Sequence, residues 1–198
     1  MKIREESGLK FGFPDGSDVV KFDDTLYYRN EFNALPGSKG VDFISDEKDT
    51  LSFIEVKNCM GNEGNNRWRI MPNNSKRMTT HTTVDVEDRD SLDIEVPQKV
   101  AMTLAALSGV KSYEKSRTSV AELKGITETS FSDKEKKKYV ILFLEGDFGS
   151  HTRSKKMIMG SLQQSMKTKM RWLNCRVSVV DSDTYDKKIF EILKLGID

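Results

Sequence analysis

Two neighbouring stretches of the chain, residues 41–44 and 51–59, are rich in apolar residues that single polar residues interrupt. Short runs of this kind, bounded by turn residues, are typical of β-strands. The residues between the stretches, at positions 45–49, are all polar and suit a turn. The pattern therefore predicts two strands that pair through this turn.

Helical spacing and apolar runs predict most of the remaining elements. Residues 91–113 and 153–173 are expected to form helices, and Pro97 suits the first turn of the first one. The uninterrupted apolar run at 139–144 predicts a central strand buried on both faces. Residues 176–180 predict a further strand and residues 185–195 a final helix. The apolar stripe of the second helix comprises Met157, Ile158, Leu162, Met166 and Met170.

The N-terminal part and the connectors carry weaker patterns. Residues 11–13 and 19–22 predict short extended pieces around a turn at Pro14, and residues 24–35 fit either a strand or a short helix capped by Asp24. A long polar loop is expected at about 60–83 and a charged connector at about 114–138. Since strands alternate with helices toward the C-terminus, we expect a single α/β domain over residues 1–198, with a mixed central sheet flanked by helices.

Composition narrows the class of protein without indicating a partner. The 198 residues are 36% hydrophobic and 32% charged, which suits a folded domain with an ionised surface. The 32 basic side chains nearly cancel the 31 acidic ones, so only the distribution of charge can indicate a ligand. Cys59 and Cys175 lie outside any CxxC pair, and no stretch has the character of a leader or a membrane span. We expect a reduced, cytoplasmic protein that does not contact a membrane.

Charged residues interrupt both of the predicted paired strands. Glu55 and Lys57 share one face of their strand, whereas Ile54 and Val56 share the other. Asp42 stands among apolar neighbours in the preceding strand. Because a buried charge without a partner is strongly destabilising, each of these side chains needs solvent or a specific partner. If the strands pair through the turn, Asp42 comes close to Glu55.

Two adjacent carboxylates repel each other unless a proton or a cation lies between them. Mg²⁺ meets that need, because it binds one or two carboxylates together with waters and phosphate oxygens of a substrate. A lysine two residues beyond Glu55 can orient a metal-bound water or stabilise charge on a phosphate. The pattern therefore indicates a metal site that cleaves phosphodiester bonds. The alternative is a structural ion pair of Lys57 with Glu55 or Asp42.

The segments Gly40-Val41-Asp42 and Ile54-Glu55-Val56-Lys57 resemble the motif of the PD-(D/E)XK (restriction-endonuclease-like) nuclease superfamily, with Val41 in place of the usual proline. The resemblance implies a restriction-endonuclease-like core. It also implies that Asp42 and Glu55 bind Mg²⁺, for which Mn²⁺ can substitute. The Val56 carbonyl would be a third ligand, and Lys57 the catalytic lysine.

Members of that superfamily often add two further side chains to the site. One is an acidic residue from an N-terminal helix, for which Glu31 is the candidate ahead of Glu5 and Glu6. The other is a glutamine from the helix after the motif, for which Gln98 is the candidate. Duplex cutters of this kind commonly act as dimers, so the resemblance is compatible with a homodimer.

Basic residues gather in the C-terminal third of the chain. Residues 148–180 include no acidic residue, and a helix with only positive charge on its polar face attracts phosphates regardless of sequence. An ordinary solvated helix that pairs with the acidic stretch at 84–95 is the alternative. The basic residues of this segment are Arg153, Lys155, Lys156, Lys167, Lys169, Arg171 and Arg176.

A second basic group, Arg67-Trp68-Arg69, follows the motif strand directly. An aromatic ring between arginines can stack on a base, although such a tryptophan can also fix its loop to the core. The predicted function is hydrolysis of phosphodiester bonds in nucleic acid, with DNA favoured, by a magnesium-dependent endo- or exodeoxyribonuclease. The alternative is a catalytically inactive nucleic-acid-binding or assembly module of the same fold.

Overall fold

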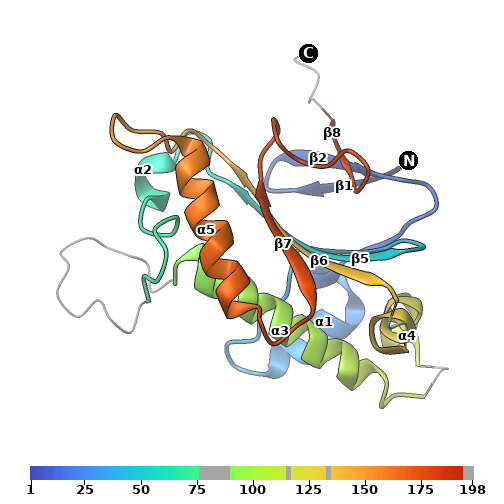
Figure 1. The fold of residues 1–198 in the computed structure, drawn as a ribbon. Helices are drawn as coiled ribbons and strands as arrows, with labels where there is room; N and C mark the ends of the chain where they lie inside the picture. The colour runs from blue at the N-terminus through green and yellow to red at the C-terminus, as the bar shows by residue number, and fades with distance from the viewer. Residues whose placement is uncertain (76–89, 115–116, 133–134, 194–198) are drawn as a thin grey trace.

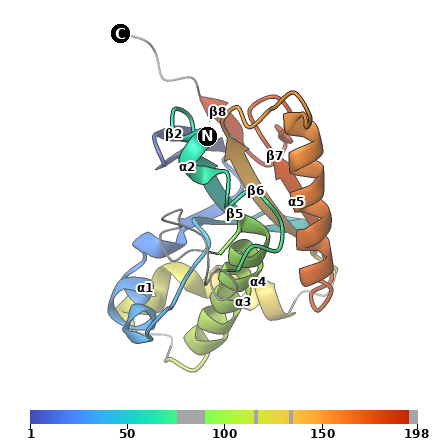
Figure 2. The ribbon, with the colours of Figure 1, turned by 90° about the vertical axis from the view of Figure 1, so that its left-hand side faces the viewer.

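The computed structural model describes residues 1–75, 90–114, 117–132 and 135–193. Its centre is a five-stranded sheet, with helices on one face and a three-stranded sheet on the other (Figure 1). The turned view shows the same layers, with α1, α3 and α4 on the side opposite β2 and β8 (Figure 2). The predicted α/β class with a mixed sheet is confirmed. The helices, however, cover one face of that sheet instead of flanking both.

The central sheet has the strand order β3, β4, β5, β6, β7. Neighbours are antiparallel among β3 (Asp18–Lys21), β4 (Phe43–Asp46) and β5 (Thr50–Asn58), and parallel from β5 through β6 (Lys137–Glu145) to β7 (Cys175–Val180). Phe43 lies opposite Ile54, so the predicted strand pair is confirmed, with its first strand beginning at Phe43. The predicted central strand is β6, which is paired on both sides.

Two long helices cover one face of this sheet. α3 (Leu92–Val110) and α5 (Lys155–Lys169) pack with α4 (Lys124–Ser132) over Phe53, Val140 and Leu142. Pro97 lies in the second turn of α3, so its expected place in the first turn is wrong. The apolar stripe of α5 is buried as predicted, except that Met157 is exposed.

The opposite face is covered by an antiparallel sheet of β1 (Lys2–Glu6), β2 (Leu9–Phe13) and β8 (Glu191–Leu193). Phe11 stands at the centre of an aromatic cluster, with its ring centroid 5.4 Å from those of Phe143 and Phe190. This cluster takes up the buried side chains on the second face of the central sheet, including Ile54 and Val56.

The C-terminal helix expected at 185–195 is wrong over the part that the structure describes. Turns occupy residues 182–184 and 187–189, and residues 191–193 form β8, which pairs with β2. The apolar positions there fitted helical spacing. Phe190 instead inserts between the two sheets, and the next residues add a strand to β2.

The segments with weak patterns form short helices. Residues 22–34 fold as η1 (Phe22–Asp24), α1 (Leu26–Asn30) and η2 (Phe32–Ala34). Thr25 caps α1 by accepting a hydrogen bond from the Tyr28 N–H, so the expected cap at Asp24 is wrong.

The predicted connector at 114–138 contributes to the core. It contains η4 (Thr118–Leu123) and α4, and Val120, Leu123 and Ile126 are fully buried. The predicted polar loop includes the short helix α2 (Glu63–Asn66), while residues 76–83 lie outside the described residues.

Candidate functional site

Asp42 and Glu55 are brought together by the pairing of β4 with β5. The register that places Phe43 opposite Ile54 places Asp42, one residue earlier, beside Glu55. The Val56 N–H donates a 2.7 Å hydrogen bond to Asp42 Oδ2 and fixes that carboxylate against the strand. The predicted proximity of the two acids therefore follows from the strand pairing.

The Glu55 carboxylate is fully buried and its two oxygens differ in their surroundings. Oε1 lies 2.8 Å from Lys57 Nζ and 2.6 Å from Lys99 Nζ. Oε2 is buried and has no hydrogen-bond partner among the residues that the structure describes. Because an unsatisfied buried carboxylate oxygen is destabilising, a further donor or a cation at this atom would be stabilising.

The positive charges near Asp42 do not fully offset its burial and the negative charge of Glu55. Burial, and next the charge of Glu55, raise the pKa of Asp42 to about 7, although Lys99 and the Val56 N–H both act to lower it. Burial acts to lower the pKa of Lys99, but the carboxylates of Glu55 and Asp42 outweigh it and leave that pKa raised. A charged lysine is thus present, and a cation placed closer to Asp42 would favour its ionised form.

A second set of carboxylates adjoins Asp42 from the N-terminal segment. Oxygens of Glu6, Asp23 and Asp42 all lie within 4.8 Å of one another. Burial, followed by the charges of Glu6 and Asp24, raises the pKa of Asp23, and its buried Oδ1 has no partner in the described part of the chain. Lys21 lies 3.0 Å from Glu6 and offsets part of this negative charge.

This donor set fits a hard divalent cation. Mg²⁺ prefers carboxylate oxygens, and Asp42 is common to both acidic groups. Two buried oxygens without partners in the described structure, Glu55 Oε2 and Asp23 Oδ1, belong to neighbours of Asp42. Asp42 and Glu55, with Glu6 or Asp23 from the N-terminal segment, are therefore the residues that could hold the metal.

The structure does not bring Glu31 or Gln98 into this site. The Glu31 carboxylate pairs with Arg117 and accepts hydrogen bonds from Tyr113 and Ser119. Gln98 is exposed on α3.

Lys99 and Glu95, from the same helix, face the site instead. Their spacing of four residues on a helix with buried Val96 and Val100 was a signal that they share one inward face. Asp23 had no comparable signal, because its approach to Asp42 depends on the tertiary fold.

The group that follows the motif strand is largely engaged within the protein. Arg69 is buried and pairs with Glu95, whose second oxygen lies 4.0 Å from Lys57 Nζ. Trp68 is half-buried, as expected of a side chain that fixes its loop to the core, and only Arg67 is exposed. The structure thus favours the packing role over base stacking for this segment.

Two lysines of the basic α5 segment are paired. Lys155 lies 2.7 Å from Asp181 and 3.5 Å from Glu145, and Lys169 lies 2.6 Å from Asp93. The last contact agrees with the alternative in which the helix pairs with acidic residues near 84–95. Within this segment, the exposed cations that form no ion pair with another described residue are Arg153, Lys156, Lys167, Arg171 and Arg176.

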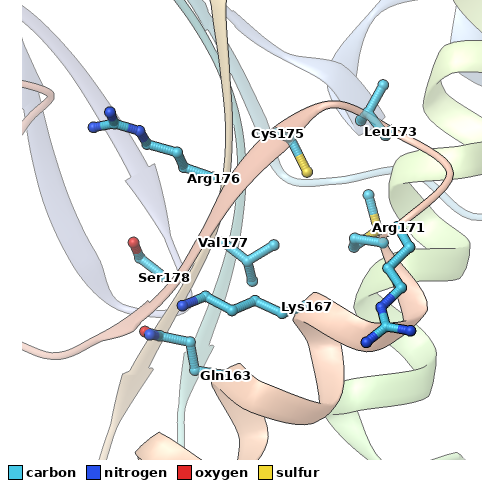
Figure 3. Close-up of a pocket in the computed structure, with 9 residues that line it drawn as sticks. Gln163, Lys167, Arg171, Leu173, Cys175, Arg176, Val177 and Ser178 are labelled. Carbon is cyan, nitrogen blue, oxygen red and sulfur yellow. The ribbon is translucent and has the colours of Figure 1, made fainter.

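Three of these cations line a pocket between the end of α5 and β7 (Figure 3). Lys167 and Arg171 come from the helix side, whereas the Arg176 side chain extends away from them and donates a 3.4 Å hydrogen bond to the Tyr139 hydroxyl. Gln163 also lines it and is held by the Val179 N–H, which donates to Oε1. None of the described side chains that line the pocket is acidic.

Comparisons with known proteins identify a family but no activity. A family model described only as a family of unknown function, DUF6661, matches residues 25–194. No curated protein and no solved structure matches the chain. Within the described residues, no helix combines the length and apolar character needed to cross a membrane. The matched segment includes Asp42, Glu55, Lys57 and Lys99. Because it covers most of the chain, the chain belongs to the DUF6661 family.

Proposed function

We propose that this protein is a metal-dependent nuclease that hydrolyses phosphodiester bonds in nucleic acid, with DNA the favoured substrate. The observation that carries the proposal is the buried Asp42–Glu55 pair, in which one carboxylate oxygen has no partner in the described structure. Lys57 lies on the same face of β5 and contacts Glu55. Two acids can hold a metal ion, and a nearby lysine can orient a metal-bound water or stabilise charge on the phosphate.

Asp42 and Glu55 would hold Mg²⁺ or Mn²⁺, with the Val56 carbonyl as a further proposed ligand. The ion, when bound, would polarise the phosphate and lower the pKa of a bound water. Lys57 Nζ, between Glu55 and Glu95, would orient that water and stabilise negative charge on the phosphate. Asp42 is kept in place by the Val56 N–H, so the chain itself positions the first ligand.

The fold supports this assignment at a coarse level. The two acids lie on neighbouring antiparallel strands of a mixed sheet, and β6 continues that sheet in parallel to the motif strand. This arrangement is compatible with a restriction-endonuclease-like core, which we include in the proposal. The exposed cations of α5 and the pocket beside β7 supply a surface for the phosphate backbone.

One observation favours a second candidate function. Lys57 and Lys99 already place two positive charges against Glu55, so the charge of this acid is balanced without a metal. In that case the protein would be a nucleic-acid-binding or assembly module that does not cleave. The two functions share the basic surface and differ only in what the acidic site does.

Cleavage assays with Mg²⁺ separate the two candidates. The full-length protein should cut DNA, and Asp42→Asn or Lys57→Met should reduce the rate by at least about 100-fold, the lower range for loss of acid–base assistance. Glu128→Gln, which removes an exposed carboxylate on α4, is the matched control and should cut normally. A folded Asp42→Asn protein that cuts as fast as the original would refute the nuclease assignment.

A further inference from the structure

Lys99 occupies an unusual position for a charged side chain. It extends from α3 toward the β4–β5 pair, with Nζ 2.6 Å from Glu55 Oε1 and 3.9 Å from Asp42 Oδ1. Its side chain is only 14% exposed. A buried ammonium between two carboxylates is a cation in the place where the proposed function puts a metal.

We propose that Lys99 is a built-in counter-ion, which holds the Asp42–Glu55 pair together in the metal-free protein and has to withdraw when a divalent cation binds. The inference rests on the proposed function, because it concerns the same metal. It adds that metal binding is a displacement of one cation by another. Lys99 would therefore set the affinity of the site and the charge of the ion that it accepts.

Electrostatics gives the reason for displacement. An ammonium and a divalent cation bound to the same two carboxylates would repel each other at short range in surroundings of low dielectric constant. A monovalent ion brings no more charge than the ammonium it replaces, so it gains nothing. A divalent ion brings twice that charge and relieves the deficit at Asp42, whose carboxyl Lys99 approaches only to 3.9 Å. The site would therefore select divalent ions by charge.

The helix offers the displaced ammonium another carboxylate. Glu95 lies one turn earlier on α3, and side chains four residues apart on a helix are neighbours. The charge of Glu95 already acts on Lys99. Lys57 is less suited to be the displaced counter-ion. It lies on the motif strand and, of the two proposed metal ligands, contacts only Glu55.

Calorimetric titration with Mg²⁺ and Mn²⁺ tests the inference on the full-length protein. Lys99→Met should bind either ion about tenfold or more tightly than the original protein, since a competing charge is removed. Lys99→Arg keeps the charge and should bind as the original does, or more weakly. Lys169→Met is the matched control, because it also removes an ammonium from a buried carboxylate on α3, that of Asp93, and should leave the affinity unchanged.

The outcomes separate this inference from the proposed function. If the original protein binds metal and Asp42→Asn abolishes the heat, but Lys99→Met binds no more tightly, Lys99 is only a structural partner and the inference fails. If neither the original protein nor Lys99→Met binds metal, the proposed function fails and the inference with it. A Lys99→Met protein that is unfolded without metal is followed by circular dichroism instead. Refolding by Mg²⁺ would support the inference, and absence of refolding would overturn it.

Discussion

At Asp42, burial and a neighbouring carboxylate both oppose ionisation. The folded protein holds the pKa of this group at about 7, against 3.8 for an unperturbed aspartate. The cost is reduced by Lys99 and by the Val56 N–H, neither of which restores the ordinary value. A carboxyl group whose pKa is raised this far by burial and a neighbouring charge is typical of a functional site.

This shift predicts how stability depends on pH. Between about pH 4 and pH 7 the folded state keeps a proton on Asp42 that the unfolded state has released, so its contribution to stability falls as pH rises through this window. Asp42→Asn has no such group. In metal-free buffer, the free energy of unfolding of the original protein should fall relative to Asp42→Asn by a few kcal/mol across the window.

Chemical denaturation at intervals between pH 4 and pH 7.5 measures this difference, and Mg²⁺ should reduce it by stabilising the ionised form. A constant difference between the two proteins over the whole range would contradict the assigned shift.

The residues of the site were predictable to different degrees. Asp42, Glu55 and Lys57 followed from period-two geometry and motif spacing, because the strand pair that joins them is local in sequence. Lys99 lies more than forty residues from Glu55, and only the packing of α3 on the sheet brings the two together. Glu31 was predicted as a site residue from its place in an N-terminal helix, but its carboxylate forms an ion pair with Arg117.

At the scale of elements, the backbone just before β4 positions Asp42. Gly40 lies two residues before Asp42 and packs against Phe22 of η1, whose N–H donates to the Asp42 carbonyl. A Cβ at Gly40 would lie 2.4 Å from the Phe22 ring and 3.2 Å from that of Tyr28. Phe22 is fully buried and cannot move aside without disturbing the core.

Gly40→Ala should therefore destabilise the protein by about 1–3 kcal/mol, the range for overpacking a buried site. Gly16→Ala is the matched control, because a Cβ there meets no atom within 4 Å. Thermal unfolding of the two variants checks the prediction. Equal melting temperatures for Gly40→Ala and the original protein would show that Gly40 is not tightly packed against Phe22.

Elements with a strong pattern were predicted well, and those that depend on distant partners were not. β6 is a long apolar run, and α5 has a clear stripe, so both follow from the sequence with small changes at their ends. β8 is three residues long, and it forms a strand because it pairs with the free edge of β2. The segment that includes α4 was predicted to be a charged connector, because its buried apolar residues Val120, Leu123 and Ile126 are few and stand among charged ones.

At the scale of the whole molecule, charge is balanced overall but unevenly placed. The formal net charge is +1, yet Lys167 and Arg171 line the pocket beside β7, where no described lining side chain is acidic. If nucleic acid binds there, Lys167→Gln with Arg171→Gln should weaken binding at low salt. The slope of log affinity against log salt should become shallower by roughly 1.8, for two lost phosphate contacts.

Fluorescence anisotropy with labelled duplex DNA over a range of salt concentrations measures that slope. Lys169→Gln serves as a control, since its ammonium is held by Asp93 and should contribute little. An unchanged slope in the double variant would place the nucleic acid elsewhere on the protein.

The layering of the molecule was predictable only in part. Alternating strands and helices predicted the mixed sheet. The extended piece expected at residues 11–13 is part of β2, but its pattern did not indicate that it belongs to a second sheet on the far face. That layer joins residues 2–13 to residues 191–193, the two ends of the described chain. It also brings Glu6 toward Asp42, so the N-terminal strand contributes to the acidic site as well as to the core.

The most direct test of the account is to locate a divalent ion. Crystals of the full-length protein soaked in Mn²⁺ should give an anomalous difference peak in contact with the carboxylates of Asp42 and Glu55, and Asp42→Asn crystals soaked in the same way should lose it. Soaked crystals with no peak at Asp42, while Lys99 still bridges the two acids, would contradict the claim that this pair is a metal site.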